Sequence, residues 1–439
     1  MPDNKKRKVD DNLPNSWAQR YDEALAMNIK PTFMDVFDRH TCYPFFSRLC
    51  DHLCIAEIVA LTRTCKKYSG LYQYLLPIQW DVDHKLRRFV KDPYGFRSQM
   101  ARHDALVSGS FVLQFFERVT WMESDLDIFI EHGEGANKFG SYLVNKEGYA
   151  LTLSTEDAEY ELHSYEEPRR YGHIQSGKCF IGEPQTKIQI ITTTKIPIKS
   201  IFRGFYSTII VNVMGWNKVY SVFPLSTSIQ HKGYQLKPID DHHAPLVNKY
   251  SRRGWDMQEI MWPEEKRINH PVRKYRRLGD RFTWTIPVDS KKVEWSKTPD
   301  YVLEYASFRM LSNHEYPGLD ERYIDYQHPP EQHVGPRCYG IDAMLFVSRT
   351  LKHTYLRPSH DYELECFLGV RVDQSTQLEL RKLELSKRPP NYDQLIQNPH
   401  ALYRHADYER PNTWTYRDDD FPGWYQAWEQ NGNKSAEPI

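Results

Sequence analysis

Two aspartates, Asp125 and Asp127, are the residues of this chain best placed to do chemistry. They alternate with the apolar Leu126, Ile128 and Ile130, and this period of two predicts a β-strand. The apolar side chains would face a core, and both carboxylates would lie side by side on the opposite face. Two adjacent carboxylates can bind the same one or two magnesium ions.

A glycine-serine pair, Gly109-Ser110, lies upstream of the aspartates at the start of a predicted helix. Such a turn offers backbone N–H groups to the oxygens of a phosphate. With the two aspartates it supplies the parts needed to hold a metal-bound nucleoside triphosphate, in which two metal ions promote an in-line displacement. The chemistry that this segment predicts is phosphoryl or nucleotidyl transfer.

This order of a Gly-Ser pair, a helix and an Asp-x-Asp strand resembles the nucleotidyltransferase superfamily, which includes DNA polymerase beta and poly(A) polymerases. The resemblance implies a mixed sheet flanked by helices over residues 80–290. It also implies that Gly109 and Ser110 bind the nucleotide, and that Asp125 and Asp127 bind Mg²⁺ and serve catalysis.

Enzymes of that superfamily need a third acidic residue on a neighbouring strand, where it completes the metal site and helps to deprotonate the attacking hydroxyl. The predicted strand 187–192 has Gln189 at this position, with Lys187 on the same face. Glutamine is an uncharged, weak ligand for magnesium and cannot act as a base, and Lys187 would repel a metal ion. The sequence therefore predicts a nucleotidyltransferase-like domain of reduced or absent activity.

No other acidic residue clearly replaces the missing one. Glu131 has the same parity as Asp127 but lies roughly 13 Å along the strand, whereas paired metal ions are only about 4 Å apart. Residues 240–243, with sequence Asp-Asp-His-His, fall in a predicted loop, and Asn212 in the predicted strand 208–214 offers a neutral oxygen at best.

Apolar residues at helical spacing predict a short helical module over residues 35–78. Pro44 fits the first turn of a helix, and Leu49 and Leu53 are one turn apart. The stretch resembles an F-box, the module that docks on the Skp adaptor of cullin-RING ubiquitin ligases. The resemblance implies that the residues contacting the adaptor are Pro44, Leu49, Leu53, Ile58 and Leu61.

The helical module departs from the F-box pattern at Tyr43, where leucine is usual, and at Phe45-Phe46, where the pattern begins with acidic residues. The alternative is an ordinary helical subdomain. Its apolar surface would then pack on the next domain or on some other partner.

Two further segments, 205–227 and 249–255, together with the Gly-Ser and Asp-Leu-Asp block, resemble a group of fungal proteins to which no activity is assigned. In that group an F-box-like segment precedes a block of the same kind. The resemblance covers most of residues 40–290, and it implies the same domain order here.

The composition limits the classes of protein and partner that this chain can be expected to represent. The 439 residues are 40% hydrophobic, and 58 Lys and Arg residues balance 58 Asp and Glu residues, so no overall charge attracts the chain to nucleic acid or to an anionic membrane. No apolar run is long enough to span a bilayer. Seven scattered cysteines without a Cys-x2-Cys pair indicate reduced thiols and make a zinc site unexpected.

Residues 1–20 are polar and predict a disordered tail. Within it, Lys5, Lys6, Arg7 and Lys8 resemble a monopartite nuclear localisation signal, which implies importin as a partner and the nucleus as the location, with the cytoplasm as a second location. The alternative is a solvated basic tail.

A second basic region, 252–277, interleaves cations with Trp255 and Tyr275. It could bind nucleic acid through phosphate contacts and stacking, or form a solvated face paired with acidic neighbours, which is the interpretation we favour. Residues 300–439 are predicted to be irregular, and no motif gives them a role.

Three hypotheses follow for this α+β chain. The first is an F-box-like adaptor whose body is an inactive nucleotidyltransferase-like domain. The second is an active metal-dependent nucleotidyltransferase that tolerates Gln189. The third is a nucleotide- or nucleic-acid-binding module without catalysis. The F-box pattern favours the first, and the Gly-Ser and Asp-x-Asp pairs favour the second. The missing acid at position 189 separates the second from the other two.

Overall fold

The computed structural model describes residues 43–156, 160–166, 186–259, 270–312, 338–359, 362–388, 390, 392–397 and 410–432. The chain divides into two compact units, Met1–Trp80 and Asp81–Ile439. The division falls two residues after the predicted end of the helical module. The predicted tail, with Lys5, Lys6, Arg7 and Lys8, lies outside the described residues.

The first unit is helical from Tyr43 onward. Its elements are α3 (Tyr43–His52), α4 (Ile55–Thr62), the 3-10 turn η1 (Lys66–Tyr68) and α5 (Leu71–Gln79). Apolar residues recur every three or four positions, so each helix turns one face inward and the unit has a small core of its own. The buried apolar residues of this unit are Phe46, Cys50, Ile55, Ile58, Tyr68, Leu71, Leu75 and Trp80.

The second unit is built on an eight-stranded mixed sheet with the order β11-β7-β6-β1-β2-β5-β4-β3. β2 and β5 pair in parallel, and the other neighbours pair antiparallel. The strands are β1 (Leu106–Ser108), β2 (Leu126–Glu131), β3 (Ala150–Glu156), β4 (Tyr160–Glu166), β5 (Lys187–Thr193), β6 (Asn212–Met214), β7 (Lys218–Ser221) and β11 (Trp284–Pro287).

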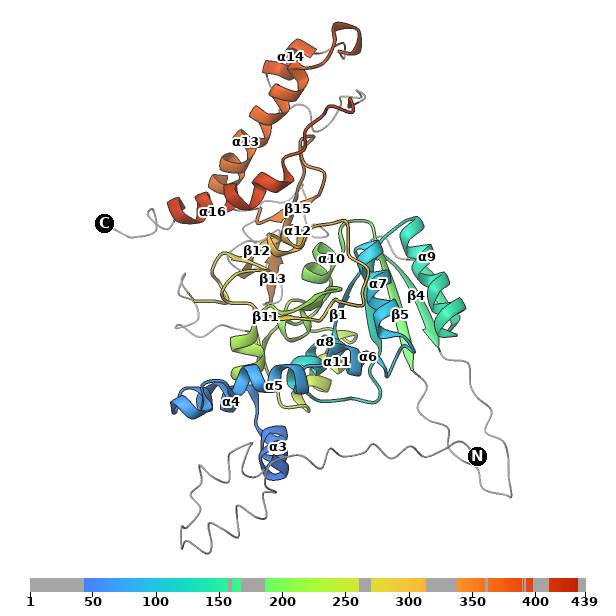
Figure 1. The fold of residues 1–439 in the computed structure, drawn as a ribbon, viewed down its shortest axis with the longest axis vertical. Helices are drawn as coiled ribbons and strands as arrows, with labels where there is room; N and C mark the ends of the chain where they lie inside the picture. The colour runs from blue at the N-terminus through green and yellow to red at the C-terminus, as the bar shows by residue number, and fades with distance from the viewer. Residues whose placement is uncertain are drawn as a thin grey trace, which may run out of the picture. The chain divides into compact units, whose positions relative to one another are not determined.

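Helices cover both faces of this sheet. α7 (Pro93–His103) and α9 (Glu134–Tyr142) lie together beside β4 and β5, as Figure 1 shows, while α10 (Pro197–Gly204) packs on β1 and β2. α8 (Ser110–Glu117) follows β1 directly. Leu126, Ile128 and Ile130 are all buried, which confirms the predicted strand and its apolar face.

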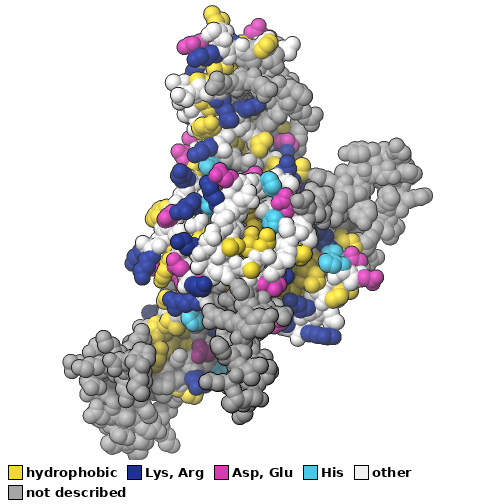
Figure 2. Space-filling model, turned by 90° about the vertical axis from the view of Figure 1, so that its right-hand side faces the viewer, with side chains coloured by type: hydrophobic (Ala, Val, Ile, Leu, Met, Phe, Trp, Pro, Cys, Tyr) yellow, Lys and Arg dark blue, Asp and Glu magenta, His cyan; other side chains and the backbone are white. Residues whose placement is uncertain are grey.

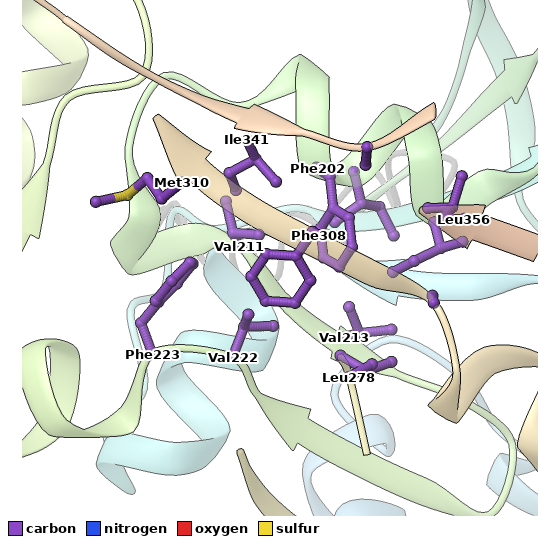
Figure 3. Packing of buried hydrophobic residues seen from close by; sticks show 14 of the residues in the cluster. Phe202, Val211, Val213, Val222, Phe223, Leu278, Phe308, Met310, Ile341 and Leu356 are labelled. Atoms are coloured by element: carbon purple, nitrogen blue, oxygen red, sulfur yellow. The ribbon is translucent and has the colours of Figure 1, made fainter. Parts of the chain in front are cut away.

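The region after residue 300 is not irregular throughout. Part of it packs on the large sheet and α10 in one hydrophobic core. β12 (Ser307–Ser312) and β13 (Tyr339–Asp342) form a three-stranded sheet with β10 (Arg276–Arg277). Phe308 of β12 and Ile341 of β13 pack with Phe202 of α10 and Val213 of β6, together with Leu356 (Figure 3). These contacts join segments that are far apart in the sequence.

The end of the chain forms a further packed cluster. α13 (Tyr362–Arg381) and α16 (Phe421–Gly432) meet around Tyr355, Leu364, Leu368, Phe421 and Tyr425. Asp418, in the 3-10 turn η9 (Asp418–Asp420), is buried and accepts hydrogen bonds from the backbone N–H groups of Lys352 and His353 and from the Tyr355 hydroxyl. The turn is therefore part of the packed structure.

One predicted strand is half wrong. Thr208–Ile210 form a 3-10 turn, and only Asn212–Met214 form β6. The turn begins at Ser207, whose hydroxyl accepts a hydrogen bond from the N–H of Ile209. Within the described part of the chain, no helix is both long and apolar enough to cross a membrane.

Candidate carboxylate site

The turn from β1 into α8 places a glycine against the second aspartate. Gly109 has φ +75° and ψ −147°, a conformation that favours glycine. A Cβ atom at Gly109 would lie 2.4 Å from Asp127 Oδ2, so the turn can approach the carboxylate only because this residue has no side chain. Ser108 pairs with Asp127 across β1 and β2, and this register brings the predicted glycine-serine turn to the Asp127 carboxylate.

Gln189 lies directly beside Asp127 in the parallel pair of β5 and β2. In the amide orientation that satisfies both of its neighbours, Gln189 Nε2 donates a hydrogen bond to Asp127 Oδ1 at 3.0 Å. Gln189, at the position expected for a third carboxylate, therefore donates a hydrogen bond to the carboxylate of Asp127.

Lys187 brings a positive charge to the same face. Its Nζ donates to Gln189 Oε1 at 2.7 Å and lies 3.7 Å from Asp125 Oδ2. The chain of contacts runs from Asp125 through Lys187 and Gln189 to Asp127. Both ends of the glutamine amide are used, and one carboxylate already faces an ammonium group.

The two carboxyl groups carry shifted pKa values. Burial raises the pKa of Asp127 to about 7, and the negative charge of Asp125 adds to the rise, while Lys187 and Lys249 oppose it. Burial also raises the pKa of Asp125, against the lowering effect of Lys187 and Lys249. Partial desolvation thus outweighs the nearby cations, and the pair favours binding a proton.

Aromatic and basic side chains border these aspartates. Lys249 and Tyr250 come from α11 (His243–Ser251), and Tyr250 hydrogen-bonds with Tyr206. Burial raises the pKa of both tyrosines, and the negative charge of Asp127 adds to the rise. The Arg253 guanidinium lies 3.8 Å from the centre of the Trp121 ring. Sequence reasoning did not assign these residues to the site, although the segments 205–227 and 249–255 stood out by resemblance.

The loop before β2 is held by Arg88. Its guanidinium donates to the carbonyl oxygens of Trp121 at 2.8 Å and of Ser124 at 3.2 Å, and also to the carbonyl oxygen of Met122. Ser124 Oγ accepts from Gln114 Nε2 of α8 at 2.8 Å. These bonds fix the backbone immediately before Asp125 relative to the glycine turn.

The donor set does not fit a two-metal centre. A magnesium ion needs several oxygen ligands, and two metals need carboxylates that bridge them. Here two carboxylates face an amide and an ammonium group. Among the described residues, no group of three His, Cys, Asp or Glu side chains is arranged to hold a metal ion.

The other candidate ligands lie elsewhere. Asp240 Oδ1 accepts from the backbone N–H of His243 at 2.7 Å and lies 2.8 Å from His243 Nδ1, so this aspartate caps the start of α11. Glu131 is exposed at the far end of β2. Asn212 is buried in β6, on the other side of β1 from β2.

The residues implied as adaptor contacts differ in how far their side chains are buried. Ile58 is fully buried, and its role as an adaptor contact stays a prediction. Leu49, Leu53 and Leu61 are partly buried. Pro44 lies in the first turn of α3, but its side chain is outside the described part of the structure.

Large apolar side chains are exposed on the same helical unit. Tyr43 is 53% exposed, Phe45 is 48% exposed and Ile78 is 54% exposed. Two of them are the residues at which the sequence departs from the F-box pattern. Exposed apolar side chains are therefore present on this unit, and these three lie outside the set implied as adaptor contacts.

Three arginines of the predicted basic region 252–277 form ion pairs within the fold, and residues 260–269 of that region lie outside the described residues. Arg276 is 1% exposed and forms an ion pair with Asp280, and Arg277 Nε lies 3.3 Å from Glu429 Oε1. Arg253 pairs with Glu123. On the side of the molecule shown in Figure 2, Lys and Arg are interspersed with Asp and Glu. These arginines therefore do not form a free phosphate-binding surface.

Comparison with known proteins gave no match to a protein-family model, to a curated protein or to a solved structure.

Proposed function

We propose that this chain is a non-catalytic interaction protein whose body is a nucleotidyltransferase-like domain without a working metal site. The observation that carries the proposal is the contact chain Asp125–Lys187–Gln189–Asp127. An ammonium group that neutralises one carboxylate reduces the attraction of the pair for a divalent cation. An amide in place of the third acid leaves no base for the attacking hydroxyl.

The helical unit supplies the interaction half of the proposal. The exposed Tyr43, Phe45 and Ile78 form apolar surface on a small helical unit, which is a typical feature of a docking segment. The F-box resemblance names the partner, the Skp adaptor of a cullin-RING ubiquitin ligase. In this proposal the second unit binds the protein that the ligase ubiquitinates.

Catalysis is tested with magnesium or manganese and each labelled nucleoside triphosphate in turn. We expect no incorporation and no labelling of the protein. Incorporation that is lost in the Asp125→Ala, Asp127→Ala variant would overturn the proposal in favour of an active nucleotidyltransferase. Nucleotide binding without turnover, lost in the same variant, would favour a binding module instead.

The adaptor is tested by pull-down with the purified Skp adaptor. We expect wild-type protein to bind and the Leu49→Asp, Leu53→Asp variant to lose binding. Failure of the wild type to bind removes the adaptor part of the proposal and leaves the non-catalytic part standing.

Nuclear entry through residues 5–8 is part of the proposal as well. Replacing Lys5, Lys6, Arg7 and Lys8 by alanine in a fluorescent fusion is expected to move the protein to the cytoplasm. An unchanged nuclear signal would remove this claim.

A further inference from the structure

A cavity of about 380 Å³ opens on the face of the large sheet opposite the aspartates. Its lining comes from α9, the π-turn η2 (Leu143–Glu147) and the strands β3, β4 and β5. The two faces follow from the register, because Gln189 and Thr192 of β5 differ in parity and Thr192 lines the cavity. The cavity is therefore separate from the carboxylate site.

The helical wall combines hydrogen-bonding and small side chains. Asn137, Ser141 and Asn145 are spaced four residues apart and form one row along α9 and η2. Ala136 and Gly140 lie beside this row and leave room for an occupant. Each asparagine offers one acceptor and two donors.

The strand wall carries two rings. Tyr165 is 8% exposed, its hydroxyl faces Gly140, and among the described residues none hydrogen-bonds to that hydroxyl. His163 is held in place by Ser154, whose Oγ lies 2.9 Å from His163 Nδ1. The Tyr165 ring, whose hydroxyl can still form a hydrogen bond, and the neighbouring His163 imidazole can together bind a flat polar ligand.

The charges around the cavity argue against an anionic ligand. No Lys or Arg is among the lining residues. Glu161, which contacts two lining residues, accepts a hydrogen bond from Thr192 Oγ1 at 3.1 Å, and its carboxylate lies 3.5 Å from His163 Nε2 and 3.4 Å from His132 Nδ1. The volume lies within the range of small-molecule sites, roughly 300–1,000 Å³.

We propose that this cavity binds an uncharged, flat, hydrogen-bonding molecule of nucleoside size. The ring lies between the helical row and the Tyr165 and His163 rings, and the asparagine amides and the Tyr165 hydroxyl bind its polar edge. Leu151 of β3, which also lines the cavity, covers one side of it.

The experiment measures binding of adenosine, guanosine, cytidine and uridine, and of their monophosphates, to the full chain by ligand-observed NMR and calorimetry. The test variant is Leu151→Trp, which fills the cavity from an exposed position, and the control is Leu153→Trp. Both leucines are about half exposed, at 53% and 49%. Leu151 pairs with Tyr165 and Leu153 with Ser164, so their side chains lie on opposite faces of the sheet.

We expect at least one nucleoside to bind the wild type and the Leu153→Trp control, and its affinity to fall at least tenfold in Leu151→Trp. Tyr165→Phe, which keeps the ring and removes the unused hydroxyl, is expected to weaken the same binding. The Asp125→Ala, Asp127→Ala variant is expected to bind normally, which separates this site from the carboxylate site.

Three results would overturn the proposal: no nucleoside binds the wild type, both tryptophan variants bind equally well, or only the nucleoside monophosphates bind. The last would show that the phosphate is recognised and that the ligand is not uncharged. Equal circular dichroism spectra of the two tryptophan variants establish that a loss of binding is not a loss of fold.

Discussion

Gln189 donates a hydrogen bond to Asp127 at 3.0 Å while its carbonyl oxygen accepts one from Lys187 at 2.7 Å. Gln189 thus links the Asp127 carboxylate, which could bind a metal ion, to the Lys187 ammonium, which repels one. Two substitutions are expected to turn this arrangement into a metal site. We expect the Lys187→Ala, Gln189→Asp variant to bind Mn²⁺ at least roughly tenfold more tightly than the wild type, because three carboxylates then converge without a cation between them.

Mn²⁺ binding to that variant is measured by electron paramagnetic resonance, and Lys187→Ala alone serves as the control. The single variant removes the opposing charge without adding an acid, so its gain is expected to be smaller. Equal Mn²⁺ affinity in the wild type and the double variant would show that the two side chains do not determine whether a metal binds.

Gly109 is expected to tolerate no side chain. In Gly109→Ala the new Cβ meets the Asp127 carboxylate in a backbone conformation that disfavours alanine, so the free energy of unfolding should fall by about 1–3 kcal/mol. Gly133 is the control, because it also has positive φ but its Cβ would meet no atom within 4 Å. Urea denaturation of both variants checks this, and a loss in Gly133→Ala as large as that in Gly109→Ala would contradict the contact.

The raised pKa of Asp127 makes stability depend on pH. The folded state keeps this proton up to about pH 7, whereas an unfolded aspartate releases it near pH 4. Between about pH 4 and 7 the folded state binds more protons, so the free energy of unfolding decreases as pH rises, by up to about 4 kcal/mol, and the decrease ends above pH 7.

Asp127→Asn is expected to remove this pH dependence and to be more stable than the wild type above pH 7. The measurement is denaturant unfolding from pH 4 to 8, with the exposed Asp241→Asn as control. Parallel stability curves for the wild type and Asp127→Asn would show that Asp127 has an ordinary pKa.

The core formed by the region after residue 300 gives a stability prediction. Phe308 is fully buried among residues of the large sheet and α10, so Phe308→Ala should cost about 3–5 kcal/mol of unfolding free energy. Leu385 is 81% exposed, and Leu385→Ala should change stability by less than about 0.5 kcal/mol. Thermal and urea unfolding test both, and a small effect of Phe308→Ala would mean that the C-terminal strands contribute little.

Adaptor docking should depend on the exposed aromatic residue of α3. Phe45→Ser removes an exposed apolar side chain, so it should abolish pull-down by the Skp adaptor. Because the buried core of the helical unit is unchanged, the unit should stay folded. Gln73→Ser, at another exposed position, is the control. Full binding by Phe45→Ser would place the docking surface elsewhere.

The core of the carboxylate site could be predicted from the sequence because it depends on strand parity. Ile188 and Ile190 alternate with Lys187 and Gln189, which puts the glutamine on the polar face of its strand, and the superfamily resemblance implied that this strand lies beside the aspartates. Lys249 and Tyr206 could not be found this way, because only the tertiary fold brings their segments to β2.

The C-terminal strands escaped prediction for a related reason. β12 is buried on both faces apart from Arg309 and Ser312, so Ser307–Ser312 shows no alternation of polar and apolar residues. The run 208–214 is mostly apolar, and a short apolar run does not distinguish a strand from a short turn of helix.

The sharing of one core by residues 106–356 also sets the order of events during synthesis. The helical unit ends at Trp80 and can fold while the ribosome is still making the sheet. The core on this side of the sheet is complete only after Phe308, Ile341 and Leu356 have been translated, long after β1 and β2. A chain that ends before residue 300 lacks the side chains that cover this apolar face.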